Sequence, residues 1–190
     1  MPTINGRACV VNGTPVDKVF SNGRQVYGRN LLTNTGDLGA GWYLEPGFVV
    51  DTSRKPAVLH YPMKTITSST YPITNKVLND GLLQPSTTYT ASFCAKGTGA
   101  FIFYCYSSVS NGAADTRTLI KLTSDYKLYT ITFTTLPNIS GSKNFLLRQD
   151  YSPVSADQST VEAYVYGFKL EKSSVATPWT PAPEDLQVRN

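Results

Sequence analysis

The sequence predicts an all-β fold, a jelly-roll β-sandwich that carries a short N-terminal β-hairpin extension. Many short segments alternate apolar and polar residues with a period of two, which is typical of strands. Turn residues separate these segments, and no window keeps the 3.6-residue apolar stripe of a helix. Aromatic residues are abundant, at 12%, and charged residues are few, at 16%. A length of 190 residues indicates one domain with a small appendage.

Residues 1–28 form the appendage. They contain three Asn-Gly steps, the strongest short hairpin signal, because both central residues of the favoured turn need positive φ. A hairpin of this size cannot bury a core of its own. It therefore packs on the domain's own sheet as an extra hairpin, or on another protein as an assembly hook, and both alternatives stay open. The three steps are Asn5-Gly6, Asn12-Gly13 and Asn22-Gly23.

The main domain is expected to span residues 29–185, with residues 186–190 as a tail. Pro62 and Pro72 confine their two short strands to sheet edges or strand ends, since proline cannot donate to a ladder. An Asn-, Gly- and Asp-rich loop is expected at residues 33–41. In chain order, strands are predicted at residues 30–32, from Trp42 onward, and at 57–62, 64–74, 88–96, 101–107, 118–122, 126–135, 144–151 and 161–170.

Alternation within these strands predicts which side chains form the core. One face of segment 88–96 is apolar and the other is mostly polar, so the first is expected inside. Segment 101–107 is a continuous aromatic run, which suits a central strand that is covered on both sides or flanked by a groove. The inward residues are expected to be Tyr89, Ala91, Phe93, Ala95, Tyr129, Ile131 and Phe133.

The closing strand and the tail behind it are the most distinctive stretch. Tyr164, Tyr166, Phe168 and Leu170 alternate with smaller or charged residues, which predicts a strand. The following segment holds three prolines and cannot form regular structure. Trp179 lies between two of them, and we expect its indole to dock on the domain and hold the C-terminus in place.

Four segments together resemble a known family. They read RNLLTNTGDLGAGW, LQPSTTYTASFCAKGTG, YKLYTITFTT, and a closing KLE followed by AT, W and PAPED. They resemble the carbohydrate-binding-module type of jelly roll found in tail and baseplate proteins of phages of Gram-positive bacteria. The match covers roughly residues 29–185. It consists mostly of residues that determine the fold, so it implies function only by association.

The resemblance implies a location, partners and a metal. The chain would be a virion protein, made in the host cytoplasm without a signal peptide, that attaches to other tail or baseplate proteins through residues 1–28 and forms a homo-oligomer. No cofactor is expected, apart from a structural calcium that resembling modules often hold near the opening loop. Asp37 would be its ligand, together with Asn34. One carboxylate is thin support, so Asp150 or Glu171 would have to join it.

Charge and cysteine usage exclude several classes. The net charge of +4 is spread along the chain without a Lys/Arg run, so no nucleic-acid partner is indicated. No apolar stretch approaches the length of a membrane span, and the N-terminus lacks the pattern of a signal peptide. Cys9, Cys94 and Cys105 match no zinc spacing and are expected to be free thiols.

The chain shows no catalytic signature and is expected not to be an enzyme. Glycoside hydrolysis needs two carboxylates held opposite each other, whereas Asp and Glu are scattered here, mostly in turns. His60 is the single histidine and has no nucleophile motif around it, so we expect it on a strand surface. No phosphate loop or dinucleotide fingerprint is present.

A binding face is the favoured hypothesis. Aromatic rings stack on sugars and short polar groups bond their hydroxyls. One sheet face is expected to carry Tyr104, Tyr106, Lys96, Arg148 and Asp150, with Ser92, Thr130 and Thr132. The alternative is a rim site lined by Trp42, Tyr43, Tyr61, Tyr71 and Tyr151.

Together with the predicted binding face, the resemblance implies a phage tail or baseplate component that binds host cell-wall polysaccharide or another surface glycan and so assists adsorption. Many copies on a virion would multiply a weak single-site affinity. The alternative is a structural decoration or neck/tail protein with the same fold and no sugar site. A third, the binding module of a secreted glycosidase, is disfavoured because neither a signal nor a catalytic domain is evident.

Overall fold

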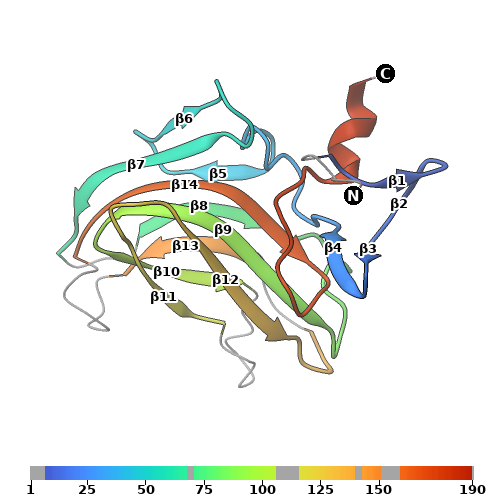
Figure 1. Cartoon of the computed structure of the whole chain (residues 1–190). Helices are drawn as coiled ribbons and strands as arrows, with labels where there is room; N and C mark the ends of the chain where they lie inside the picture. Colours follow the sequence, from blue (N-terminus) through green and yellow to red (C-terminus); the bar gives the residue numbers. More distant parts are fainter. Residues whose placement is uncertain (1–6, 68–70, 106–115, 140–142, 151–158, 190) are drawn as a thin grey trace.

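The computed structural model describes residues 7–67, 71–105, 116–139, 143–150 and 159–189. Two five-stranded antiparallel sheets pack face to face as a sandwich (Figure 1). Sheet 1 has the order β11 (Thr118–Lys121), β10 (Ala100–Cys105), β13 (Asn144–Gln149), β8 (Tyr71–Val77) and β5 (Trp42–Leu44). Sheet 2 has the order β12 (Lys127–Thr134), β9 (Thr88–Thr98), β14 (Thr160–Glu171), β7 (Val58–Thr65) and β6 (Val49–Asp51). The predicted jelly-roll sandwich is confirmed.

The core lies between the sheets and is aromatic. Tyr89, Ala91, Phe93 and Ala95 all point inward from β9 with no more than 1% exposure, as the alternation predicted. Phe93 contacts rings from both sheets, at centroid distances of 5.8 Å to Phe103 and 6.2 Å to Phe168. The inward faces of β10 and β13 contribute Phe101, Phe103, Cys105, Phe145 and Leu147, all fully buried.

A bulge in β14 changes the face on which its side chains lie. The register with β9 shifts between Tyr166 and Lys169, around Gly167 at φ 71°. Val165 and Phe168 are both fully buried, whereas Tyr164 and Tyr166 are only half-buried and lie on the outer face. The prediction that Tyr164 and Tyr166 share a face with Phe168 is therefore wrong. A glycine inside a strand often marks such a bulge.

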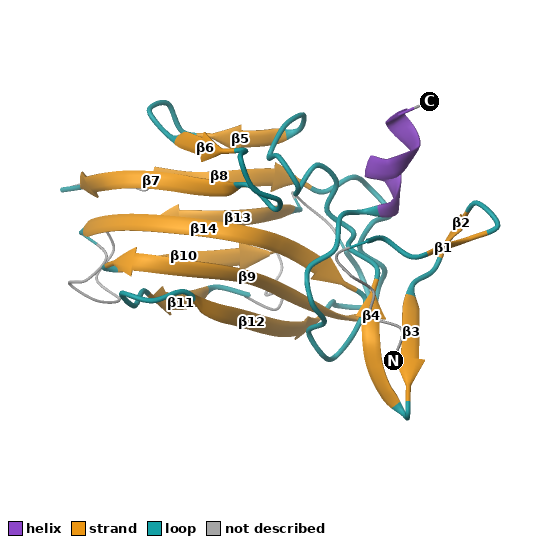
Figure 2. Ribbon diagram, turned by 45° about the horizontal axis from the view of Figure 1, so that its top comes forward, coloured by secondary structure: helices purple, strands orange, loops and turns teal. Residues whose placement is uncertain are grey.

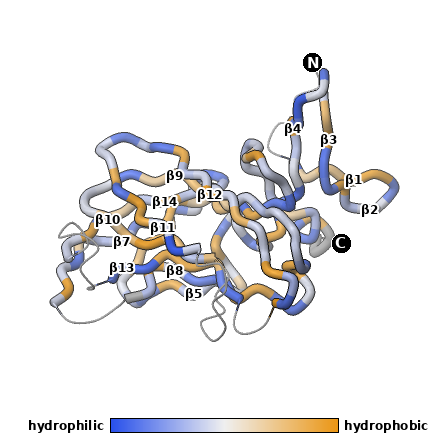
Figure 3. The backbone as a smooth tube through the Cα atoms, turned by 90° about the horizontal axis from the view of Figure 1, so that it is seen from below, coloured by the Kyte–Doolittle hydropathy of each residue, from blue (hydrophilic) through white to orange (hydrophobic). Residues whose placement is uncertain are grey.

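Two small hairpins precede the sandwich and extend away from it (Figures 2 and 3). They pair β1 (Val10–Val11) with β2 (Thr14–Pro15), and β3 (Lys18–Ser21) with β4 (Arg24–Gly28). Each turn is an Asn-Gly step with φ positive at both residues, 49° and 79° in the first and 49° and 74° in the second. The hairpin prediction is confirmed for these two steps, and the Asn5-Gly6 step lies outside the described residues.

Asn30 joins the opening segment to the closing strand. Its side chain is fully buried. The amide nitrogen donates to the carbonyls of Phe168 and Thr180, at 3.1 and 3.0 Å, and the amide oxygen accepts from Leu170 N at 3.2 Å. These bonds replace a strand ladder, so the strand predicted at residues 30–32 does not form. The tail then ends in a 3-10 helix over Pro183–Arg189.

A buried ion pair lies where β4, β14 and the tail meet. Lys169 and Glu171 are 1% and 0% exposed, with Nζ 3.7 Å from Oε1. Thr177 bonds both of them: its hydroxyl accepts from Lys169 Nζ at 2.7 Å and donates to Glu171 Oε2 at 2.9 Å. Gly28 N also donates to this hydroxyl, at 3.0 Å. Every charge at this junction is therefore matched by an opposite charge or a dipole.

Trp179 docks as expected, since its Nε1 donates to Thr35 Oγ1 at 3.2 Å and its Cβ and ring lie against Gly167.

All three cysteines are free, and only Cys105 is fully buried. Cys94 lies in sheet 2 and Cys105 in sheet 1, so the two thiols belong to different layers of the sandwich. None of the described helices has the length and apolar character needed to cross a membrane.

Candidate functional site

The outer face of sheet 1 carries a row of side chains that runs across four strands. The register aligns Tyr104 of β10 with Leu146 of β13, Leu146 with Asn75 of β8, and Asn75 with Tyr43 of β5. Aligned residues share a face, so one tyrosine stands at each end of the row. Three strand spacings separate their backbones, or roughly 14 Å. We call these four residues the sheet 1 row.

Arg148 and Asp150 stand beside Tyr104 on the same face. The Arg148 guanidinium carbon lies 5.6 Å from the centre of the Tyr104 ring. Nη2 donates to Asp150 Oδ2 at 2.7 Å, and Nε lies 2.6 Å from Oδ1. The pair is partly accessible, with the side chains 25% and 12% exposed. Carboxylate and guanidinium groups fixed beside a ring are suited to bonding the hydroxyls of a polyol.

Tyr43 marks the other end of the row and is 46% exposed. Its hydroxyl donates to Glu45 Oε2 at 2.7 Å, and this bond raises the pKa of Tyr43. Between the tyrosines, the buried amide oxygen of Asn75 accepts no hydrogen bond from any residue that the structure describes. An unsatisfied buried acceptor calls for a further donor, such as a water or a ligand hydroxyl.

Lys96 does not belong to this face, which corrects the sequence prediction. It lies on β9 in sheet 2, as do Ser92 on β9 and the facing Thr130 on β12. Thr132 lies on β12 as well. The error has a physical reason: alternation tells which residues of a strand share a face, but it does not tell to which sheet the strand belongs.

Trp42 is not available to a ligand. It is 9% exposed, lies 5.1 Å from Phe168 and 6.3 Å from Phe145 by ring centroids, and donates from Nε1 to Thr33 O at 3.0 Å. The prediction that Trp42 contacts sugar is therefore wrong, because its ring fills the core. Tyr61, of the rim alternative, is fully buried. Tyr106 and Tyr151 lie outside the described residues, as does the Tyr71 side chain.

Sequence patterns did not indicate Asn75 or Leu146 as site residues, and they indicated Tyr43 only for the rim alternative. Tyr43 directly follows Trp42 on β5, and alternation alone sends it to the opposite face. Strict application of the two-residue period of a strand would have placed Tyr43 on the face opposite Trp42. Asn75 lies beyond the strand predicted at residues 64–74, so no signal marked it.

Asp37 and its described neighbours do not supply the several oxygen ligands that a calcium ion requires. Its Oδ1 accepts from Gly39 N at 3.0 Å, within its own turn. Asp150 is held by Arg148 and Glu171 by Lys169, so neither joins Asp37. Among the described residues no three His, Cys, Asp or Glu side chains gather into a group that could hold a metal. These residues do not fit a calcium cage built from several oxygens.

Comparison with known proteins shows which solved structures share the fold of this chain. Searches find no matching protein family and no matching curated protein. Solved structures do match. The family 11 carbohydrate-binding module of a cellulosomal cellulase of Clostridium thermocellum is 16% identical, with a TM-score of 0.50, over 75% of this chain and 94% of that one.

A CBM22-1 xylan-binding domain from Paenibacillus barcinonensis is 14% identical, with a TM-score of 0.50, over 80% of this chain and 99% of that one. A cyclase from Fischerella sp. TAU is 14% identical, with a TM-score of 0.46, over 77% of this chain and 98% of that one. At such identities the likeness shows the fold alone. The chain therefore has a jelly roll of the kind seen in carbohydrate-binding modules.

Proposed function

We propose that this protein binds a saccharide chain on the outer face of sheet 1. One observation carries the proposal: the register places Tyr104 and Tyr43 at the two ends of one row, with the Arg148–Asp150 pair beside the first ring. Flat amphipathic rings bind the apolar faces of sugars, and the pair and Asn75 supply partners for hydroxyls. The spacing of the two tyrosines suits a chain of several sugars.

The proposed ligand is cell-wall polysaccharide or another surface glycan of a Gram-positive host, and the proposed setting is a phage tail or baseplate. The support is the sequence resemblance of four segments to such proteins, together with the carbohydrate-binding-module fold. Repeated copies would raise the avidity of a weak site. In the competing proposal, a structural tail protein, the tyrosines would serve subunit contacts.

We expect Tyr104→Ala to weaken binding of the recognised polysaccharide about tenfold, or ~1.4 kcal/mol, and Tyr43→Ala to do the same. Each ring is partly exposed and lies outside the core. The free energy of unfolding of each variant should therefore stay close to that of the wild type. The measurement is a binding isotherm against polysaccharides from a screen of plant and cell-wall glycans.

The matched control is Met63→Ala, which truncates a 61% exposed side chain on β7 of sheet 2. Affinity should stay unchanged in this variant. If the screen finds no glycan that binds even a multimerised protein, the structural proposal replaces this one. Equal losses in Met63→Ala and Tyr104→Ala would also contradict the assignment of the site.

The N-terminal hairpins support the proposed attachment to another protein or another copy. A groove of about 940 Å³ lies between hairpin β3–β4 and residues 174–178. Phe20 and Val175 line it and are 60% and 48% exposed. Lys18 and Arg24 line it too and form no ion pair with any described residue. Exposed apolar side chains beside unpaired cations are typical of a protein contact surface.

We expect Phe20→Ser combined with Val175→Ser to abolish self-association or incorporation into virions without changing thermal stability, because both side chains are exposed. Sedimentation velocity and virion incorporation by complementation are the readouts. Leu128→Ser, at a 57% exposed position of sheet 2, is the control. An unchanged mass together with unchanged incorporation would show that the groove is not a contact surface.

A further inference from the structure

A second row of side chains crosses the outer face of sheet 2, on the opposite side of the sandwich. Tyr164 of β14 is aligned with His60 of β7 on one side and with Lys96 of β9 on the other. Tyr126 completes the row immediately before β12, because the next residue, Lys127, is aligned with Ala95. We call His60, Tyr164, Lys96 and Tyr126 the sheet 2 row.

The rings of this row contact one another, and two of them contact the Lys96 ammonium. His60 and Tyr164 stack with centroids 4.2 Å apart and planes 4° from parallel. The Lys96 ammonium lies 5.4 Å from the Tyr164 ring centre and 4.9 Å from that of Tyr126. A lysine placed over two ring faces is oriented by their quadrupoles.

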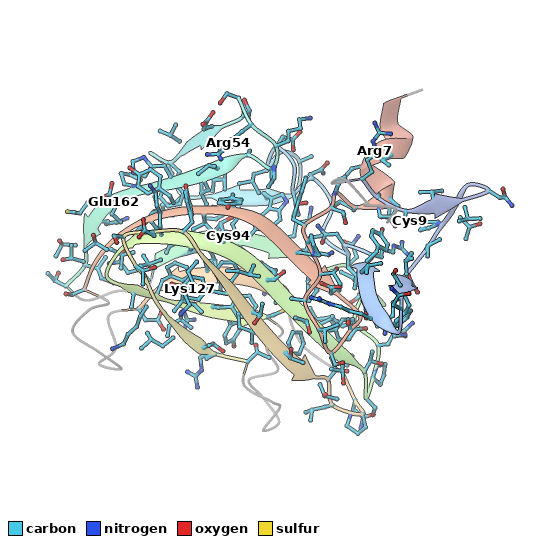
Figure 4. All side chains as sticks on the ribbon, in the orientation of Figure 1. Arg7, Cys9, Arg54, Cys94, Lys127 and Glu162 are labelled. Carbon is cyan, nitrogen blue, oxygen red and sulfur yellow. The ribbon has the colours of Figure 1, made fainter. Side chains whose placement is uncertain are left out.

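Tyr166 and Arg54 extend the row. Tyr166 meets Tyr126 edge to face with centroids 4.9 Å apart, and the Arg54 guanidinium lies 5.9 Å from the Tyr166 ring centre. Figure 4 shows Arg54 over this sheet, with Glu162 toward one end of it. The row therefore presents two ring-bound cations, one beside Tyr126 and one beside Tyr166.

Two carboxylates, Glu162 and Asp51, lie near the two cations of this face, but in the part of the chain that the structure describes neither is paired with Lys96 or Arg54. Neither Lys96 nor Arg54 makes an ion pair or a hydrogen bond to a described residue. Glu162 is engaged by His60 Nε2 at 3.0 Å and by the Tyr164 hydroxyl at 3.3 Å. Asp51 is near enough to interact with the charge of Arg54, but its carboxylate accepts from Ser53 N at 2.9 Å.

We propose that the sheet 2 row binds an acidic saccharide chain, one that bears carboxylate or phosphate groups. Lys96 and Arg54 would bond the anionic groups, and the exposed Leu128 and Val49, at 57% and 59%, would contact the apolar faces of the sugar rings. Ring faces covered by cations disfavour simple stacking of a neutral sugar.

Polygalacturonate tests the proposal. It should bind with an affinity that falls as salt rises, whereas the fully methyl-esterified polymer should not bind this row. Lys96→Gln and Arg54→Gln should each weaken polygalacturonate binding about tenfold. Lys18→Gln, which removes one charge from hairpin β3–β4, should have no effect. Tyr104→Ala should not change polygalacturonate binding either. A failure of the sheet 2 proposal can therefore be distinguished from a failure of the sheet 1 proposal.

Three results would overturn the proposal. The first is no binding of polygalacturonate by the wild-type chain. The second is a loss in Lys96→Gln no greater than in Lys18→Gln. The third is poly-glutamate binding as tightly as polygalacturonate with the same dependence on Lys96, which would show a surface for acidic protein segments instead of sugars.

Discussion

We expect Lys169→Met to lower the free energy of unfolding by about 3–5 kcal/mol at pH 7. The change removes the ammonium that faces Glu171 at 3.7 Å and leaves the carboxylate fully buried. Burial lowers the pKa of Lys169 to about 8 and raises that of Glu171, while each charge partly offsets the other. Chemical denaturation with urea measures the loss.

The dependence on pH separates a charge effect from lost packing. Burial raises the pKa of Glu171 in the folded state, and removing Lys169 should raise it further. A raised folded-state pKa favours folding below the unfolded pKa, and this contribution is lost as pH rises through the folded pKa. The deficit of Lys169→Met relative to wild type should therefore shrink as pH falls toward the unfolded pKa of about 4.5.

The double variant Lys169→Met with Glu171→Gln is the control for this prediction. It removes both charges and keeps much of the volume, so it should be more stable than Lys169→Met alone. Two results together would show that the pair acts only through packing. The stability deficit of Lys169→Met would stay constant with pH, and the double variant would be no more stable than Lys169→Met.

We expect Gly97→Ala to cost about 3 kcal/mol or more. Gly97 has φ 144°, which an L-residue rarely adopts, and an added Cβ would lie 1.9 Å from the backbone carbonyl oxygen of Glu162. That oxygen belongs to β14, next to β9, so relief would require the two strands to separate. Thermal and urea unfolding give the magnitude.

Gly36→Ala is the matched control. Gly36 lies outside the positive-φ region and has no atom within 4 Å of an added Cβ. The free energy of unfolding should change by no more than about 0.5 kcal/mol there. Similar costs at both positions would mean that the close approach of β9 to β14 at Gly97 does not constrain the fold.

Local patterns in the sequence predicted the strands and their buried faces well. The period of two on β9 identified Tyr89 and Phe93 as core, and two Asn-Gly steps identified the hairpin turns. These features depend on neighbouring residues only: alternation follows from the pleat, and positive φ from the absence of a side chain on glycine.

The candidate site depended on contacts that local patterns do not contain. Lys96 and Tyr104 lie on consecutive strands, yet one belongs to sheet 2 and the other to sheet 1. The bulge at Gly167 placed Tyr164 outside, because one shifted register reverses the face of every residue before it. Trp42 is buried by Phe145 and Phe168, more than a hundred positions away in the sequence. The errors at Lys96 and Trp42 therefore came from long-range packing, whereas Gly167 was a local sign of the bulge.

The most direct test of the proposed sheet 1 site is to map a bound oligosaccharide by amide chemical shifts. The sugar would be a short fragment of the polysaccharide that the screen identifies. We expect the largest shifts at Tyr43, Asn75, Tyr104 and Arg148, on β5, β8, β10 and β13. Shifts confined to sheet 2 or to the hairpins, with the sheet 1 row unchanged, would contradict it.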